Sequence, residues 1–236
     1  MKISLHPESE DPALQKAFQT EQVSFKELTF QKKILYIWDY YKWWFIIAAF
    51  LIVSAVILVP QILENKKDCV LYALFVNTQI TDQTTTSLMD DFVEYADIDL
   101  ERKRITLDPS LKINLKSADT LSMNSSQKMV ALLGNKTMDL VIEDEDCYRH
   151  YASLGVFINL EEELPAELLE KCRPYLVYTS GSEDGGNEKA YGINLKDCKI
   201  LQKENAYVVE PYFSICMNAK EKENAIKFLE YLFSDM

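Results

Sequence analysis

Four consecutive acids, Glu143-Asp144-Glu145-Asp146, are the first candidates for binding chemistry in this chain. They follow an apolar run at 138–142 that has the length of a buried strand. Carboxylates just beyond a parallel strand lie where open α/β sheets bind ligands, and adjacent acids can also coordinate a cation. The alternative is structural, because Asp144 is a favourable helix N-cap and first-turn acids complement the helix dipole. Consecutive side chains point in different directions, so we favour the structural interpretation and expect no metal ion.

Residues for nucleophilic catalysis are scarce. The chain has two histidines, His6 and His150, and only His150 has a cysteine close by in sequence, Cys147. No Gly-x-Ser-x-Gly elbow accompanies them, and the six glycines form no phosphate-binding loop. We therefore expect neither an enzyme nor a cofactor, with a hydrolase based on His150 as the remote alternative.

The five cysteines all follow residue 68 and form no Cys-x-x-Cys motif. In an oxidising compartment they allow up to two disulfides whose pairing the spacing does not determine. In a reducing setting the same residues are small buried hydrophobes. Both interpretations remain open.

An uncharged apolar segment at 43–63 (WWFIIAAFLIVSAVILVPQIL) separates a short N-terminal part from the rest of the chain. As a helix it would extend about 31 Å, which matches the hydrocarbon layer of a bilayer. We therefore expect a membrane-spanning helix, acting as an uncleaved signal anchor, with the lipid bilayer as its partner.

Aromatic residues and lysines around this segment predict its surroundings. The membrane-interface residues are Trp38, Tyr40, Tyr41, Lys42, Trp43 and Trp44. Rings and a lysine amine suit the headgroup layer. Four lysines lie just before the span and two just after it, which places the N-terminus in the cytoplasm and the large C-terminal part outside.

Five segments are predicted from this pattern. They are a loose cytoplasmic tail at 1–23, a juxtamembrane amphipathic helix at 24–42 opened by a capping box at Ser24, the span at 43–63, an exit linker at 64–68 and a domain at 69–236. Acids and lysines balance before the span, so the net charge of −12 belongs to residues 64–236. This acidity excludes nucleic acid as a partner.

The domain alternates strand and helix patterns in its first half. The expected strands are 69–76, 104–107 and 138–142, and the expected helices are 84–96, 125–133 and 145–153. Such alternation implies crossover connections and a mostly parallel sheet. The second half predicts a short helix at 164–172, a hairpin of 175–179 and 190–193, one or two strands within 206–217 broken at Pro211, and a closing helix at 220–233.

The segment 138–165 (MDLVIEDEDCYRHYASLGVFINLEEELP) resembles extracellular solute-binding proteins of the kind that feed ABC importers. In that family a strand reading DLV precedes a helix, a glycine and an apolar stretch that leads to a polar helix. Residues 126–134 look like the helix before that strand, 191–193 (YGI) like the family's YGIP strand, and 225–232 like its closing helix. The resemblance implies one extracytoplasmic α/β domain equivalent to a single lobe of a periplasmic binding protein.

Binding positions in that family come largely from loops at strand ends. By that resemblance the ligand-binding residues here are Asn77, Thr78, Glu143, Asp144, Tyr191 and Gly192. The expected function is a membrane-tethered, non-catalytic binding domain for a solute or a cell-surface protein. The alternative is a structural or assembly subunit of a membrane complex, held by the aromatic residues and the span.

Overall fold

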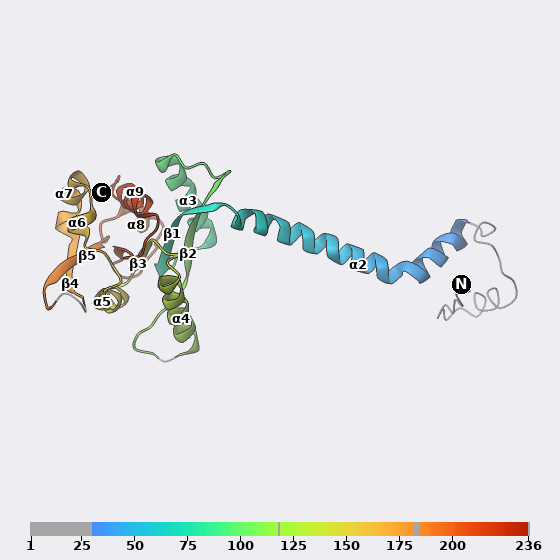
Figure 1. Cartoon of the computed structure of the whole chain (residues 1–236), viewed down its shortest axis with the longest axis horizontal. Coiled ribbons are helices and arrows are strands. Elements are labelled where there is room, and N and C mark those ends of the chain that lie inside the picture. Colours follow the sequence, from blue (N-terminus) through green and yellow to red (C-terminus); the bar gives the residue numbers. More distant parts are fainter. Residues whose placement is uncertain (1–29, 118, 182–184, 236) are drawn as a thin grey trace. The chain divides into compact units, whose positions relative to one another are not determined.

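The computed structural model describes residues 30–117, 119–181 and 185–235, and the chain divides into two units after Lys66. The described part of the first unit is a single long helix, and the second unit is an α/β domain (Figure 1). The predicted tail at 1–23 and the capping box at Ser24 lie outside the described residues.

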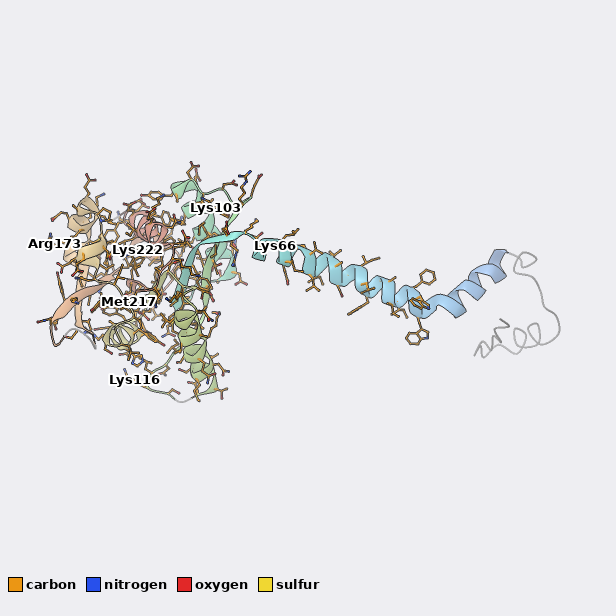
Figure 2. All side chains as sticks on the ribbon, in the orientation of Figure 1. Lys66, Lys103, Lys116, Arg173, Met217 and Lys222 are labelled. Carbon is orange, nitrogen blue, oxygen red and sulfur yellow. The ribbon has the colours of Figure 1, made fainter. Side chains whose placement is uncertain are left out.

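Helix α2 (Phe30–Asn65) contains residues 30–42 of the juxtamembrane helix predicted at 24–42, and the whole predicted span at 43–63. Residues 24–29 lie outside the described ones. Residues 30–42 and the span form one helix because its sole helix-breaking residue, Pro60, lies close to the C-terminal end. Residues Trp43–Glu64 are the one described segment long and apolar enough to cross a membrane, and none of it is buried against protein. Side chains of the described segment 43–64 accordingly project from the helix on all sides (Figure 2).

Two of the predicted interface residues, Trp43 and Trp44, are exposed at the start of this segment. The other four, Trp38, Tyr40, Tyr41 and Lys42, fall on helical backbone, and their side chains lie outside the described ones.

One six-stranded sheet organises the second unit, in the order β2-β1-β3-β6-β5-β4. Its strands are β1 (Asp68–Val76), β2 (Lys103–Leu111), β3 (Leu140–Glu143), β4 (Leu176–Ser180), β5 (Glu188–Asn194) and β6 (Tyr212–Ile215). Strand β1 is parallel to β2 and to β3, whereas the β3–β6, β6–β5 and β5–β4 pairs are antiparallel. The expected α/β class is confirmed, but the sheet is mixed rather than mostly parallel.

One pair of the antiparallel half is joined by a connection too short for a crossover helix. Strands β4 and β5 are joined by residues 181–187, which is a hairpin length. This confirms the predicted hairpin. Strand β6 begins directly after Pro211 and returns between β3 and β5, so a single strand occupies the region where one or two were expected.

Seven further helices lie in the described part of the second unit. They are α3 (Asp82–Ala96), α4 (Thr120–Gly134), α5 (Glu145–Ser153), α6 (Leu160–Glu163), α7 (Ala166–Cys172), α8 (Lys199–Lys203) and α9 (Lys222–Leu232), with a short 3-10 turn at Arg173–Tyr175. Polar caps set where they begin: side chains of Thr81, Asp119 and Asp144 each accept a backbone N–H three residues on. Helices α6 and α8 were not expected from the sequence.

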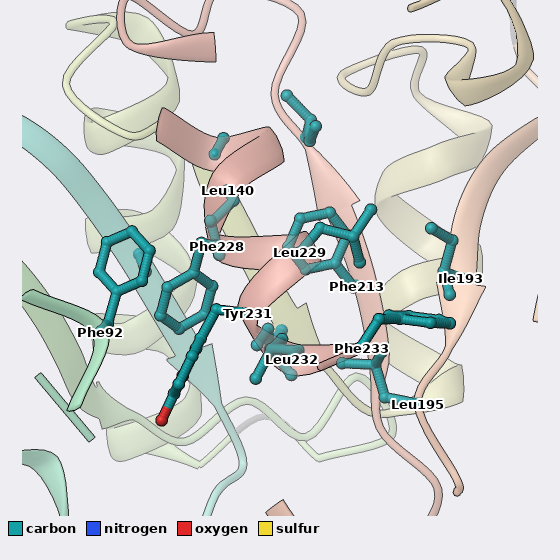
Figure 3. Packing of buried hydrophobic residues seen from close by; sticks show 14 of the residues in the cluster. Phe92, Leu140, Ile193, Leu195, Phe213, Phe228, Leu229, Tyr231, Leu232 and Phe233 are labelled. Atoms are coloured by element: carbon teal, nitrogen blue, oxygen red, sulfur yellow. The ribbon is translucent and has the colours of Figure 1, made fainter. Parts of the chain in front are cut away.

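Two apolar layers cover the sheet. On one face, which we call the α3–α9 face, Phe92 and Phe228 meet edge to face with ring centroids 4.9 Å apart (Figure 3). On the other, the α4–α5 face, the ring of Tyr148 stacks on that of Tyr212 at 5.2 Å, and Met129 of α4 is fully buried. Both layers lie wholly within the second unit, so this unit has a core of its own.

Among the boundaries that differ from the predicted ones, the two largest differences have identifiable reasons. Strand β2 continues past Asp108-Pro109 to Leu111, because β2 is an edge strand where a proline costs no ladder hydrogen bond. Helix α4 begins at Thr120 rather than Ser125, because Asp119 caps it.

A buried carboxylate ties the start of β3 to the rest of the sheet and to the approach of α9. Asp139 accepts the backbone N–H of Tyr72 at 2.8 Å and those of Lys220 and Glu221 at 2.9 Å each. It thereby joins β1, β3 and the chain entering α9 without any counter-charge in these contacts.

All five cysteines are unpaired in the structure. Cys147, Cys172, Cys198 and Cys216 are buried, and Cys69 is half-buried. The four buried cysteines therefore act here as small core residues, and the disulfides that the sequence left open are not formed.

Candidate functional site

The carboxyl ends of β1 and β3 lie side by side, and the chain leaves them in opposite directions. After β1 it enters α3 on one face of the sheet, and after β3 it enters α5 on the other face. Such a divergence is the topological switch point at which open α/β sheets bind their ligands. The candidate site is therefore the edge formed by Asn77 after β1 and Asp144 after β3.

Asn77 and Asp144 are in direct contact. The Asn77 Nδ2 donates to Asp144 Oδ2 at 2.6 Å and to the carbonyl of Ile113 at 2.7 Å. Its Oδ1 accepts the backbone N–H of Ile113 at 2.8 Å. Asn77 adopts a φ of 56°, a left-handed conformation that asparagine tolerates better than most residues. One side chain thus joins the ends of β1 and β3 to the segment after β2.

Beside this contact lies an open cleft of about 420 Å³, a size suited to a small molecule. The lining residues come from the end of β1, the segment after β2 and the first turns of α4 and α5. They are Asn77, Lys112, Ile113, Asn114, Leu115, Asp119, Leu121, Ser122, Asp144 and Asp146. Polar groups converge from four elements, while Leu115 and Leu121 offer exposed apolar side chains at the same place.

The charged groups of the cleft are partly committed to the protein. Asp119 Oδ1 and Asp144 Oδ1 cap α4 and α5 through the N–H groups of Ser122 and Cys147, at 2.8 and 2.9 Å. The Lys112 Nζ donates to the carbonyl of Thr78. Each carboxylate oxygen has a further lone pair, so Asp119 and Asp144 can still accept hydrogen bonds from a ligand in the cleft.

Thr78 is buried and works as a structural anchor. Its hydroxyl donates to the carbonyl of Ala206 at 2.7 Å and accepts the N–H of Ile80 at 3.2 Å. It fixes the segment before β6 to the end of β1, and only its backbone carbonyl reaches toward Lys112 of the cleft.

Glu143 points away from solvent into the α4–α5 face. Its side chain is 0 % exposed, and neither carboxylate oxygen has a hydrogen-bond partner. Burial, followed by the neighbouring charge of Asp144, raises the pKa of Glu143 well above its ordinary value of 4.5. The last residue of β3 is therefore a neutral acid at low pH and a strongly disfavoured carboxylate once ionised.

The four acids diverge, as their adjacency suggested. Glu143 points inward, Asp144 caps α5, Glu145 pairs with Arg149 at 2.7 Å, and Asp146 pairs with Lys116 at 2.7 Å (Lys116 is labelled in Figure 2). No group of three acids, histidines or cysteines is placed to hold a metal ion within the part of the chain that the structure describes.

Tyr191 and Gly192 lie in β5, separated from β3 by β6. Tyr191 belongs to the core of the α4–α5 face, and Gly192 lies against the Tyr148 ring of α5. A Cβ on Gly192 would come within 2.5 Å of the Tyr148 ring. That ring is fixed because the Tyr148 hydroxyl bonds the carbonyl of Val177 at 3.0 Å. These two predicted residues therefore lie in the core of the α4–α5 face, whereas Asn77 and Asp144 line the cleft itself.

Cys147 and His150 do not form a catalytic pair. Cys147 is buried, and burial, with the charges of Glu143 and Asp144, raises the pKa of its thiol, which disfavours the reactive thiolate. His150 is exposed in the last turn of α5, with its ring against that of Tyr151 at 5.1 Å.

Most of the cleft lining comes from residues 112–122, which lie between the predicted strand at 104–107 and the predicted helix at 125–133 and were assigned to neither. Lys112, Asn114 and Leu121 were not predicted as site residues. One usable signal was Asp119-x-x-Ser122, which is an N-cap pattern and would have placed a helix start, and hence a polar edge, at this point.

Comparison of the chain with protein-family models, with curated proteins and with solved structures gave no match. What the site does must therefore be inferred from its geometry.

Proposed function

We propose that this chain is a membrane-tethered, non-catalytic binding protein whose α/β domain holds a small polar solute in the cleft at the β1/β3 switch point. The observation that carries the proposal is the contact between Asn77 and Asp144 on the wall of a cleft of about 420 Å³. Polar and charged side chains form most of the lining, beside the two exposed leucines, which suits a small polar solute better than an apolar one.

The tether is α2, whose segment Trp43–Glu64 is long and apolar enough to span a bilayer. We further propose that the domain faces the outside of a bacterial cell. The bias of lysines toward the N-terminal side of the span, Lys26, Lys32, Lys33 and Lys42 against Lys66 and Lys67, supports this orientation.

The likeness to one lobe of a solute-binding protein fits this proposal in a limited way. Two-lobed members close over their ligand, whereas the cleft here is formed within one sheet and the two helices above its edge. A single lobe with such a cleft is expected to bind weakly and exchange its solute quickly, because no second lobe encloses the ligand.

Ligand-dependent thermal stabilisation tests the proposal. The full chain in detergent micelles is heated with millimolar L-lysine, L-glutamate, spermidine or glucose, which cover cationic, anionic and neutral polar chemistry. A solute at 100 times its Kd stabilises the folded state by about 2.7 kcal/mol. We expect at least one class to raise the Tm in a saturable way. If none does, solute binding is wrong, and the assembly role for the span and its aromatic residues becomes the better hypothesis.

A further inference from the structure

We propose that protonation of Glu143 regulates the cleft, because the neutral carboxyl allows the first turn of α5 to pack on the sheet and the ionised carboxylate opposes that packing. This inference concerns the regulation of the site described above and rests on its proposed function.

The position of Glu143 is the first support. It is the last residue of β3 and its side chain lies on the α4–α5 face, opposite to Ile142, which packs on the α3–α9 face. Its register partner on β6 is Tyr212, and two residues along β6 the hydroxyl of Ser214 is also buried without a partner. Two unpaired polar side chains on neighbouring strands are thus buried under this layer.

Within the described residues, the surroundings of Glu143 contain no cation that would stabilise its carboxylate. The titratable and charged neighbours are Asp144, Cys147, Tyr148 and Tyr151 at or on α5, Tyr212 and Cys216 at β6, and Tyr207 before β6. These are acids, thiols and phenols, so within the described residues Glu143 faces no cation. Its ionisation would place an uncompensated charge in the interior, next to the carboxylate of Asp144.

Asp144 couples this event to the cleft. It follows Glu143 directly, caps α5 through the N–H of Cys147, and holds Asn77 at 2.6 Å. Both Asn77 and Asp144 line the cleft. Any displacement of the β3–α5 junction that hydrates Glu143 therefore moves the carboxylate that fixes the cleft wall.

The sign of the pH dependence follows from linkage. The closed junction holds Glu143 with a raised pKa, so it binds a proton more tightly than the open, hydrated junction, in which the pKa is near 4.5. Packing of the first turn of α5 on the sheet is therefore most favourable at low pH. It weakens as the pH rises from about 4.5 toward the raised pKa of Glu143. Over this window the closed-to-open ratio falls by up to about tenfold per pH unit.

Hydrogen exchange followed by mass spectrometry tests this on the ligand-free full chain in detergent micelles. Protection factors, corrected at each pH for intrinsic exchange, are measured for peptides covering α5, with peptides of α9 as the internal reference. We expect protection in α5 to fall by up to about tenfold per pH unit in the wild type and to stay level in Glu143→Gln and Glu143→Leu.

Glu145→Gln is the matched control, because Glu145 is an exposed acid two residues away that pairs with Arg149. It should keep the wild-type slope. A level wild-type profile, a slope that survives in Glu143→Gln, or a slope that Glu145→Gln removes would each overturn the inference. The exchange measurements contain no ligand, so their outcome is independent of the solute test. If protection in α5 depends on pH as expected but no solute raises the Tm, the proposed function is refuted while the role of Glu143 protonation stands.

Discussion

The two faces of the sheet differ in what they bury. The α3–α9 face is filled by aromatic and aliphatic side chains such as Phe92 and Phe228, which meet edge to face. The α4–α5 face also buries apolar groups, but among them are the unpartnered Glu143 and Ser214. The cleft opens at the edge of this second face, between the first turns of α4 and α5. The α3–α9 face is thus arranged for stability, whereas the α4–α5 face retains polar groups that cost stability and lie next to the candidate site.

The largest expected effect lies on the α3–α9 face. Phe228→Ala removes a fully buried ring that packs against Phe92 and Tyr231, and should lower the free energy of unfolding by about 3–5 kcal/mol. Urea unfolding of the full chain in micelles measures this. The pH dependence of protection in α5 should stay unchanged, and a loss of both together would mean that the two faces do not act separately.

A smaller effect is expected under α5. Gly192→Ala brings a Cβ within 2.5 Å of the Tyr148 ring, which is held by its hydroxyl bond to Val177, so about 1–3 kcal/mol of stability should be lost. Gly134→Ala is the matched control, because nothing lies within 4 Å of the new Cβ at the end of α4. Equal unfolding midpoints for the two variants would show that Tyr148 can move aside.

The smallest effect concerns an acid whose pH dependence has the opposite sign to that of Glu143. Burial alone would raise the pKa of Asp108, but hydrogen bonds from Lys128 and Ser110 lower it to about 2. The contribution of Asp108 to the free energy of unfolding is therefore present at a pH above its ordinary pKa of 3.8, and it is lost as the pH falls toward 2. Asp108→Asn should cost about 1–2 kcal/mol at pH 7 and flatten the acid limb of stability against pH, measured by urea unfolding.

Asp146→Asn serves as the reference for Asp108, since both partners of its pair with Lys116 are more than half exposed and solvent screens their attraction, so little stability should be lost. If the free energy of unfolding falls in the same way toward low pH in the wild type and in Asp108→Asn, the stabilising role given to Asp108 is contradicted.

The positions of Asn77 and Asp144 at the ends of strands could be read from the sequence. Asn77 and Asp144 follow apolar runs, and because parallel neighbours end at the same edge, their meeting could be expected. The inward direction of Glu143 could not, because β3 is buried on both faces and its apolar run shows no alternation that separates them. An acid at the end of such a run resembles a solvent-facing cap.

The elements with strong local patterns were predictable in both halves of the domain, including the β4–β5 hairpin and α9, whereas the order of the strands in the sheet was not. Crossover helices with caps and apolar periods predicted β1, α3 and β3 close to their observed bounds. The placement of β6 between β3 and β5 depends on long-range pairing of a four-residue strand, Tyr212–Ile215, which leaves no local pattern. The role of Gly192 was hidden for the same reason, since Tyr148 reaches it from a different element.

Filling the cleft tests the proposed function most directly. Leu121→Trp places a larger side chain on the cleft lining, and Val130→Trp adds the same ring to an exposed position of the same helix away from that lining. With a solute that raises the Tm of the wild-type chain, we expect the shift to vanish in Leu121→Trp and to persist in Val130→Trp. An undiminished, saturable shift in Leu121→Trp would contradict the assignment of this cleft as the binding site.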